Sequence, residues 1–161
     1  ILERAGPVTG DGSITCFFCV LVEVDDTNEP ISDAVRGILD GHIVLDRKIA
    51  ERGRFPAIDV LRSISRTMPH CNTEEQNRLV IYARKMIAVY NDMAEMIRLG
   101  AYQKGSNMEV DLAIQYLPQL ESFLNQLPTE TTSMKMSYNL LAQILNVKHQ
   151  NEGITNVSEN T

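Results

Sequence analysis

Residues 40–69 read DGHIVLDRKIAERGRFPAIDVLRSISRTMP and alternate between extended and helical patterns. The apolar run at 42–45 predicts a strand, and the charged residues 47–52 predict a brief helix. Gly53 is expected to end that helix, because glycine adopts the positive-φ conformation of a C-terminal cap without strain. A second extended run at 57–60 leads into two arginines, which are well placed to meet a phosphate outside a strand end. An ordinary surface loop explains two arginines equally well.

The residues before this stretch continue the alternation. Residues 13–24 form a nearly continuous apolar run, which is typical of a strand buried on both faces. Pro30 suits the first turn of a helix, and apolar residues at helical spacing follow through residues 31–39. This order of strands and helices favours a parallel sheet. It supplies too few strands to close a domain, so we expect further strands before residue 1.

After Pro69 the pattern predicts helices alone. Thr73 and Gln76 form a capping box, and apolar residues recur at helical spacing as far as Gly100. The stripe contains several methionines and is typical of a packed core. We expect a helical domain to begin near residue 71.

Two more helices are expected in this part of the chain. One begins after Asn107 and should be kinked or broken at Pro118, whose ring removes a backbone donor and clashes with the preceding turn. The other begins at Ser133 and continues through Leu145. Residues 148–161 are polar, and we expect them to be a disordered tail.

Composition limits the possible classes of protein. The 161 residues are 43% hydrophobic and 22% charged, which is ordinary for a globular protein. No apolar run approaches the roughly 20 residues that a membrane helix needs, so no transmembrane segment is expected. The net charge of -6 argues against nucleic-acid binding, which requires a basic face. The chain begins mid-pattern at Ile1 without an initiator methionine, which suggests a fragment.

The three cysteines invite a metal or redox interpretation. Cys16 and Cys19 form a C-x-x-C pair, a spacing that elsewhere marks zinc or redox chemistry. Residues three apart on a strand point to opposite faces, so these two sulfurs would not share a metal. Cys71 follows His70 but has no other ligand nearby in the sequence. We expect three reduced thiols, with Cys16 and Cys19 in the core and no metal site.

Four segments, three of them in or overlapping residues 40–69, occur in an order that carries a family resemblance: DDTNEP at 25–30, LDGHIVL at 39–45, FPAIDV at 55–60, and Ser65-Arg66. This order resembles the C-terminal part of the flagellar type III protein-export ATPases, which are rotary-type ATPases similar to the α and β subunits of ATP synthase. The resemblance extends over about residues 1–147. It implies an α/β region followed by an all-α region: the end of a P-loop-type, parallel-sheet nucleotide domain at 1–70 and a helical C-terminal domain at 71–147.

The resemblance also implies a function. It implies a homohexameric ring, cytoplasmic and peripheral at the inner-membrane export gate, that hydrolyses ATP with Mg²⁺ at subunit interfaces to energise protein export. The implied partners are a coiled-coil stalk protein, export substrates and their chaperones. No G-x-x-x-x-G-K-[ST] phosphate loop occurs in the sequence, so these residues alone are expected to be inactive. Two alternatives stay open: a virulence type III secretion ATPase, and a non-catalytic ring subunit or interaction module.

Two parts of a nucleotide site are implied by the resemblance. Arg66 matches the arginine finger that reaches the γ-phosphate in a neighbouring subunit, although a structural ion pair is its alternative. Arg62 matches no such motif and is interpreted as structural. Phe55 matches the aromatic residue that lies against adenine, with a core phenylalanine as the alternative. Phe123 is a further candidate for the other face of the adenine, although a core position explains it better.

A third part of the resemblance concerns the central stalk. Asp25, Asp26 and Glu29 match the pore loop that touches the rotating stalk in ATP synthase. Carboxylates attract basic side chains on a helix, and their field steers an encounter. A solvated acidic turn is the alternative.

Overall fold

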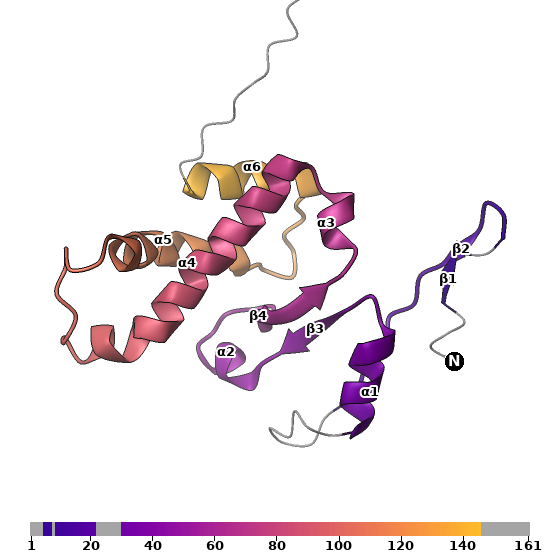
Figure 1. The fold of residues 1–161 in the computed structure, drawn as a ribbon, viewed down its shortest axis with the longest axis horizontal. Helices are drawn as coiled ribbons and strands as arrows, with labels where there is room; N and C mark the ends of the chain where they lie inside the picture. The colour runs from indigo at the N-terminus through magenta and orange to yellow at the C-terminus, as the bar shows by residue number, and fades with distance from the viewer. Residues whose placement is uncertain (1–4, 8, 22–29, 146–161) are drawn as a thin grey trace, which may run out of the picture. The chain divides into compact units, whose positions relative to one another are not determined.

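The computed structural model describes residues 5–7, 9–21 and 30–145 (Figure 1). The predicted tail at 148–161 and the acidic loop at 25–29 lie outside the described residues. No helix in the described part of the chain has both the length and the apolar character that a bilayer crossing requires. The predicted order, strands with short helices and then helices alone, is confirmed.

The chain divides into two compact units. The first contains Ile1–Leu45 and Ile58–Cys71, and the second contains Asp46–Ala57 and Asn72–Thr161. The segment between the two parts of the first unit therefore clusters with the long helices, although the sequence alone groups it with the strands around it.

The first unit contains short strands and helices: β1 (Gly6–Pro7), β2 (Ser13–Ile14), α1 (Pro30–Ile38), β3 (Gly41–Leu45), β4 (Ile58–Ser65) and α3 (Met68–Cys71). β3 and β4 lie side by side and run in opposite directions, with Gly41 opposite Ser65 and Leu45 opposite Ile58 (Figure 1). β1 and β2 form a second antiparallel pair.

The antiparallel pairing of β3 with β4 corrects the predicted parallel pairing of these strands. Parallel neighbours need a crossover connection of a dozen or more residues, which is usually a full helix. Here the connection, residues 46–57, is at the lower limit of that length and contains only the short helix α2 (Arg47–Glu51) in place of a full helix. The Asp46 N–H donates to the Ala57 carbonyl oxygen at 2.9 Å, which closes the connection into a loop. Gly53 has the predicted positive φ, at 80°.

β4 is longer than predicted, since it continues to Ser65 where the sequence suggested a loop after residue 60. The pairing of β4 with β3 is irregular between His42 and Val44, and side-chain hydrogen bonds bridge this irregularity. The Asp59 carboxylate accepts hydrogen bonds from the backbone N–H groups of Leu61 and Arg62, at 2.9 and 3.1 Å. The Ser63 hydroxyl donates to the Asp59 carbonyl at 2.6 Å and accepts from the Val44 N–H at 3.0 Å. These bonds replace regular ladder bonds at the bulge.

The apolar run at 13–24 is not a buried strand over its described length, and this expectation was wrong. Only Ser13 and Ile14 are in a strand, and Phe17 is 91% exposed. Cys16 and Cys19 are likewise exposed, against the predicted core position. An apolar strand is buried only where neighbouring elements cover its faces, and among the described residues only β1 pairs with this run.

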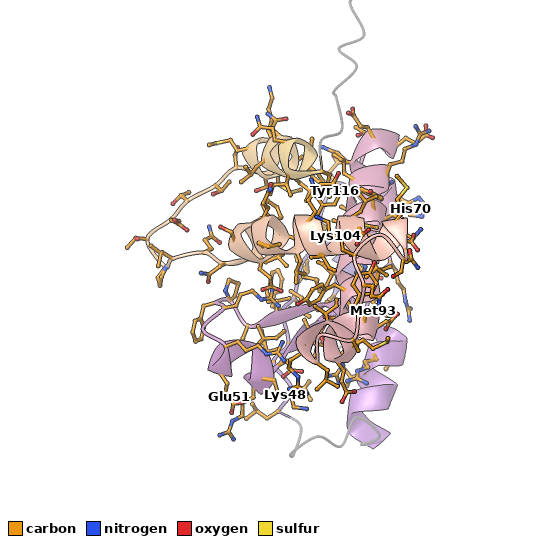
Figure 2. All side chains as sticks on the ribbon, turned by 90° about the vertical axis from the view of Figure 1, so that its left-hand side faces the viewer. Lys48, Glu51, His70, Met93, Lys104 and Tyr116 are labelled. Carbon is orange, nitrogen blue, oxygen red and sulfur yellow. The ribbon has the colours of Figure 1, made fainter. Side chains whose placement is uncertain are left out.

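The second unit is built from α2 and three longer helices: α4 (Glu74–Arg98), α5 (Met108–Leu124) and α6 (Met134–Ile144). α4 packs against α5, and α6 contacts both (Figure 1). The most deeply buried side chains in this core come from all three helices: Leu79, Met86, Ala113, Leu120, Ala142. Tyr116, labelled in Figure 2, packs edge to face on Tyr82 with ring centroids 6.3 Å apart.

The helix ends follow the predicted signals. Thr73 and Gln76 form the capping box of α4, and the side chains of Asn107 and Ser133 cap α5 and α6. α5, however, continues through Pro118 to Leu124. A proline inside a helix costs roughly 3 kcal/mol. Burial of residues on both sides of Pro118, Leu120 among them, offsets this cost, since burying one leucine contributes roughly 1.5–3 kcal/mol.

An ion pair joins α4 to α5 at their surfaces. Lys85 of α4 lies against Glu109 of α5. The hydrogen bond that the Lys85 ammonium donates to the Glu109 carboxylate, followed by the negative charge of that carboxylate, raises the pKa of Lys85 above its ordinary value. Both side chains remain about half exposed, so salt screens this pair.

Candidate functional site

Arg66 follows the last residue of β4, in the first unit. Its backbone N–H donates to the Asp40 carbonyl oxygen at 2.8 Å, and its Nη2 donates to the Arg36 carbonyl oxygen at 3.4 Å. The side chain is exposed. Within the described part of the chain, no carboxylate lies at ion-pair distance from Arg66. Most of its guanidinium donors are therefore available to an anionic ligand, which favours that role over a structural ion pair.

Arg66 borders a shallow hollow of about 360 Å³ in the same unit. The lining residues come from the end of α1 and from the paired strands: Arg36, Gly37, Leu39, Gly41, His42, Ile64, Arg66. The lining includes two arginines and no acidic residue. Guanidinium groups bind phosphate oxygens through paired N–H donors.

A glycine allows the backbone contact that holds Arg66. A Cβ atom at Gly41 would lie 2.5 Å from the Ile64 carbonyl oxygen and 3.1 Å from the Ser65 Cα. Only glycine permits β3 and β4 to approach this closely. The Ser65 hydroxyl accepts a hydrogen bond from the Met68 N–H at 3.1 Å, which fixes the turn from β4 into α3.

Phe55 lies in the second unit, against the C-terminal end of α5. Its N–H donates to Asn125 Oδ1 at 2.9 Å, and its carbonyl oxygen accepts from the Gln126 N–H at 2.7 Å. The ring is 54% exposed, so it is not a core phenylalanine. An exposed aromatic face on a tethered backbone is suited to stacking on a flat ligand.

An ion pair supports the same contact. Arg54 Nε lies 3.1 Å from Glu121 Oε2, and the Arg54 side chain is only 12% exposed. Phe123 is half-buried on the same turn of α5, two residues before Asn125. The structure therefore brings Phe55 to the helix turn that carries Phe123. The sequence pointed to both aromatic residues but not to Asn125 or Glu121, because no local signal marks a contact across 70 positions.

The remaining expectations concern a metal site and the contact between the acidic loop and a stalk protein. No group of three His, Cys, Asp or Glu side chains among the described residues could hold a metal ion, so none of these residues is assigned to Mg²⁺. Asp25, Asp26 and Glu29 lie outside the described residues, and their contacts stay a prediction. Arg66 and Phe55 lie in different units.

Two family models match successive parts of the chain. The model for the ATP synthase alpha/beta family, nucleotide-binding domain, matches residues 1–65, and the model for the T3SS EscN ATPase C-terminal domain matches residues 72–143. A flagellum-specific ATP synthase of Caulobacter vibrioides is 54% identical over 151 residues, which cover 90% of this chain and 34% of that protein. An SPI-2 type 3 secretion system ATPase of Salmonella typhimurium is 45% identical, covering 90% of this chain and 33% of that protein. The chain thus spans about a third of the length of these relatives.

Two solved structures of a type III secretion ATPase are also similar to this chain. The assembled ATPase EscN from the enteropathogenic E. coli type III secretion system superposes with a TM-score of 0.85 at 42% identity, over 89% of this chain and 35% of that one. EscN in complex with its central stalk EscO superposes with a TM-score of 0.80 at 40% identity, over 89% of this chain and 34% of that one.

Proposed function

Because this chain belongs to the ATP synthase alpha/beta family, we propose that it forms the C-terminal part of an ATPase that energises flagellar type III protein export. The two family models that follow one another along the chain carry this proposal. The flagellum-specific ATP synthase of Caulobacter vibrioides is 54% identical to this chain and the SPI-2 ATPase of Salmonella typhimurium is 45% identical, and on this difference we favour flagellar export. Virulence secretion is the second candidate, supported by the likeness to EscN.

The proposed enzyme is a cytoplasmic homohexamer at the inner-membrane export gate that hydrolyses ATP with Mg²⁺ between subunits. The assembled state of EscN supports the ring, and its complex with EscO supports a stalk partner, here bound by Asp25, Asp26 and Glu29. Export substrates and chaperones complete the set of partners. Since the sequence contains no phosphate-loop motif, this chain alone is expected to be inactive.

In this proposal Arg66 is the arginine finger. Its exposed guanidinium follows β4 and is anchored at its backbone by Asp40. Phosphoryl transfer spreads negative charge over the γ-phosphate oxygens, and a planar guanidinium meets several of them without losing its own proton. In a ring, the residue would act on ATP bound by the neighbouring subunit.

Phe55 and Phe123 contact the adenine base of the nucleotide in this proposal. The half-exposed ring of Phe55 stacks on one face of the adenine, because a purine stacks on an aromatic side chain with offset geometry. Phe123 is half-buried and offers a smaller surface for the opposite face.

The test is turnover of the full-length enzyme with altered Arg66. Arg66→Ala is expected to lower ATP turnover by roughly 10³- to 10⁵-fold while folding and nucleotide affinity stay close to wild type. Arg66→Lys keeps the charge but loses the planar fork, so it should not restore turnover. Arg62→Ala, at an exposed position of β4 four residues before Arg66, is the matched control and should retain turnover.

Mixed rings decide whether Arg66 acts on its neighbour. A subunit without the phosphate-loop lysine has a dead site and an intact Arg66, whereas an Arg66→Ala subunit has the opposite defect. Mixed in one ring, the two should recover part of the activity at interfaces that combine a good site with a good arginine. Mixed rings that form and stay as inactive as each variant alone would refute action in trans.

A further inference from the structure

We propose that Asn125, supported by the Arg54–Glu121 ion pair, is a positioning residue that holds Phe55 in place for the base of the bound nucleotide. The end of α5 then contributes to nucleotide affinity through Phe55. This inference rests on the proposed function, because base stacking by Phe55 is itself a proposal.

The backbone of Phe55 is held from both sides. The Phe55 N–H donates to the side-chain oxygen of Asn125 at 2.9 Å, and the Phe55 carbonyl oxygen accepts from the Gln126 N–H at 2.7 Å. These bonds flank the Phe55 Cα, so they restrict the backbone rotations that would swing the ring. Both partners lie just beyond the last residue of α5, and Asn125 is the C-terminal cap of that helix. The ring therefore takes its position from a regular element.

The adjacent ion pair adds a second anchor. Arg54 directly precedes Phe55, and Glu121 lies in the last turn of α5, four residues before Asn125, so both anchors belong to the C-terminal end of this helix. The Arg54 side chain is 12% exposed and Glu121 is 46% exposed, so solvent screens this pair less than it screens the more exposed pairs Arg47–Glu51 and Glu74–Arg78. Two neighbouring residues of the loop are thus fixed to consecutive turns of one helix.

This arrangement predicts an effect on binding rather than on chemistry. A base that stacks on a preordered ring does not have to order the loop when it binds, so less binding free energy is lost. The reacting γ-phosphate lies at the other end of the nucleotide, and Phe55 does not touch it in this proposal. Loosening Phe55 should therefore raise KM for MgATP and leave kcat near wild type.

The first measurement is steady-state ATP hydrolysis by the full-length enzyme carrying Asn125→Ala. KM is expected to rise about 2- to 10-fold, the range for loss of one hydrogen bond, with kcat unchanged. Asn125→Asp keeps an acceptor oxygen and should restore most of the affinity. Asn139→Ala, the same substitution at an exposed position of α6, is the matched control and should leave KM unchanged. Glu121→Gln should also raise KM, and it replaces Asn125→Ala in the measurement if that variant does not fold.

A double-mutant cycle with Phe55→Ala separates the possible outcomes. Phe55→Ala alone should raise KM by about 5- to 150-fold if the ring stacks on the base, and Asn125→Ala should then add almost nothing, because its effect passes through the ring. If Phe55→Ala leaves KM unchanged, base stacking itself fails and this inference fails with it. If Phe55→Ala raises KM but the Asn125→Ala effect is absent, or persists in full beside it, only the positioning role is refuted. A fall in kcat that parallels a fall in Tm would also refute it, in favour of general structural support.

Discussion

Replacing Gly41 with alanine adds one methyl group where β3 and β4 approach closely. The new Cβ would lie 2.5 Å from the Ile64 carbonyl oxygen and 3.1 Å from the Ser65 Cα. Both obstacles are backbone atoms, so no side chain can turn away to relieve the contact. Bringing the carbon–oxygen distance to about 3.3–3.6 Å requires the strands to separate by about 0.8–1.1 Å.

This separation should reach Arg66. Asp40, directly before Gly41, accepts the Arg66 N–H at 2.8 Å, and Ser65 directly precedes Arg66. A displacement of about 1 Å at a catalytic group can cost about 10²-fold in rate. Overpacking itself lowers the free energy of unfolding by about 1–3 kcal/mol. The free energy of unfolding of an ordinary domain is about 5–15 kcal/mol, so the variant should remain folded. Gly41→Ala is therefore expected to lower turnover roughly 10²-fold in a protein that remains folded.

The assay compares ATP turnover and thermal unfolding of the full-length enzyme with Gly41→Ala and with Gly37→Ala. Gly37→Ala in α1 is the matched control: Gly37 lines the same hollow as Arg66, but a Cβ there meets no atom within 4 Å, so this change adds the same methyl group without a clash. Alanine in that helix should leave turnover intact and raise stability by about 0.5–1 kcal/mol. Wild-type turnover in Gly41→Ala, or a loss that appears only as the protein unfolds, would refute the argument that this contact positions Arg66.

Two further predictions concern charge. Replacing Asp25 and Asp26 by Asn and Glu29 by Gln should weaken binding of the stalk protein at low salt in titration calorimetry. The difference should shrink toward physiological ionic strength, where the screening length is about 8 Å; unchanged affinity at low salt would exclude this loop as the stalk contact. Glu109 raises the pKa of Lys85, so the pair stabilises the fold below the ordinary lysine pKa of 10.5, and this contribution is lost as pH rises through the higher folded-state pKa. Between neutral pH and that alkaline range, the Tm difference between wild type and Glu109→Gln should therefore shrink as Lys85 loses its proton, and a difference that stays constant across this interval would contradict the assignment.

Signals confined to a few neighbouring residues were sufficient to predict the helix boundaries. The capping box of Thr73 and the cap of Ser133 connect groups three residues apart, and Gly53 adopts its positive φ within one turn. Such bonds form whatever the rest of the chain does. The start of α1 at Pro30 follows the same logic, because a proline suits the first turn of any helix.

Expectations that depended on distant partners failed. Cys16 and Cys19 are exposed because β1 is the only strand in the described part of the chain that pairs with the apolar run containing them. The pairing direction of β3 and β4 depends on how the chain returns between them, which an alternating pattern does not encode. At Pro118 only the expected break is contradicted, since α5 continues to Leu124 and packing on both sides outweighs the local penalty, whereas the expected kink stays a prediction.

The candidate site divides in the same way. The order of short motifs pointed to Arg66 and Phe55 without any coordinates, and their roles stay predictions. The bonds that hold them, from Asp40 to Arg66 and from Asn125 to Phe55, appear only in three dimensions. The reason is physical: a residue's type determines the donors and charges it carries, whereas the partner of each donor is determined by how the whole chain packs. A backbone N–H at Phe55 meets a carboxamide 70 positions away only after α5 has formed and the loop has folded onto its end.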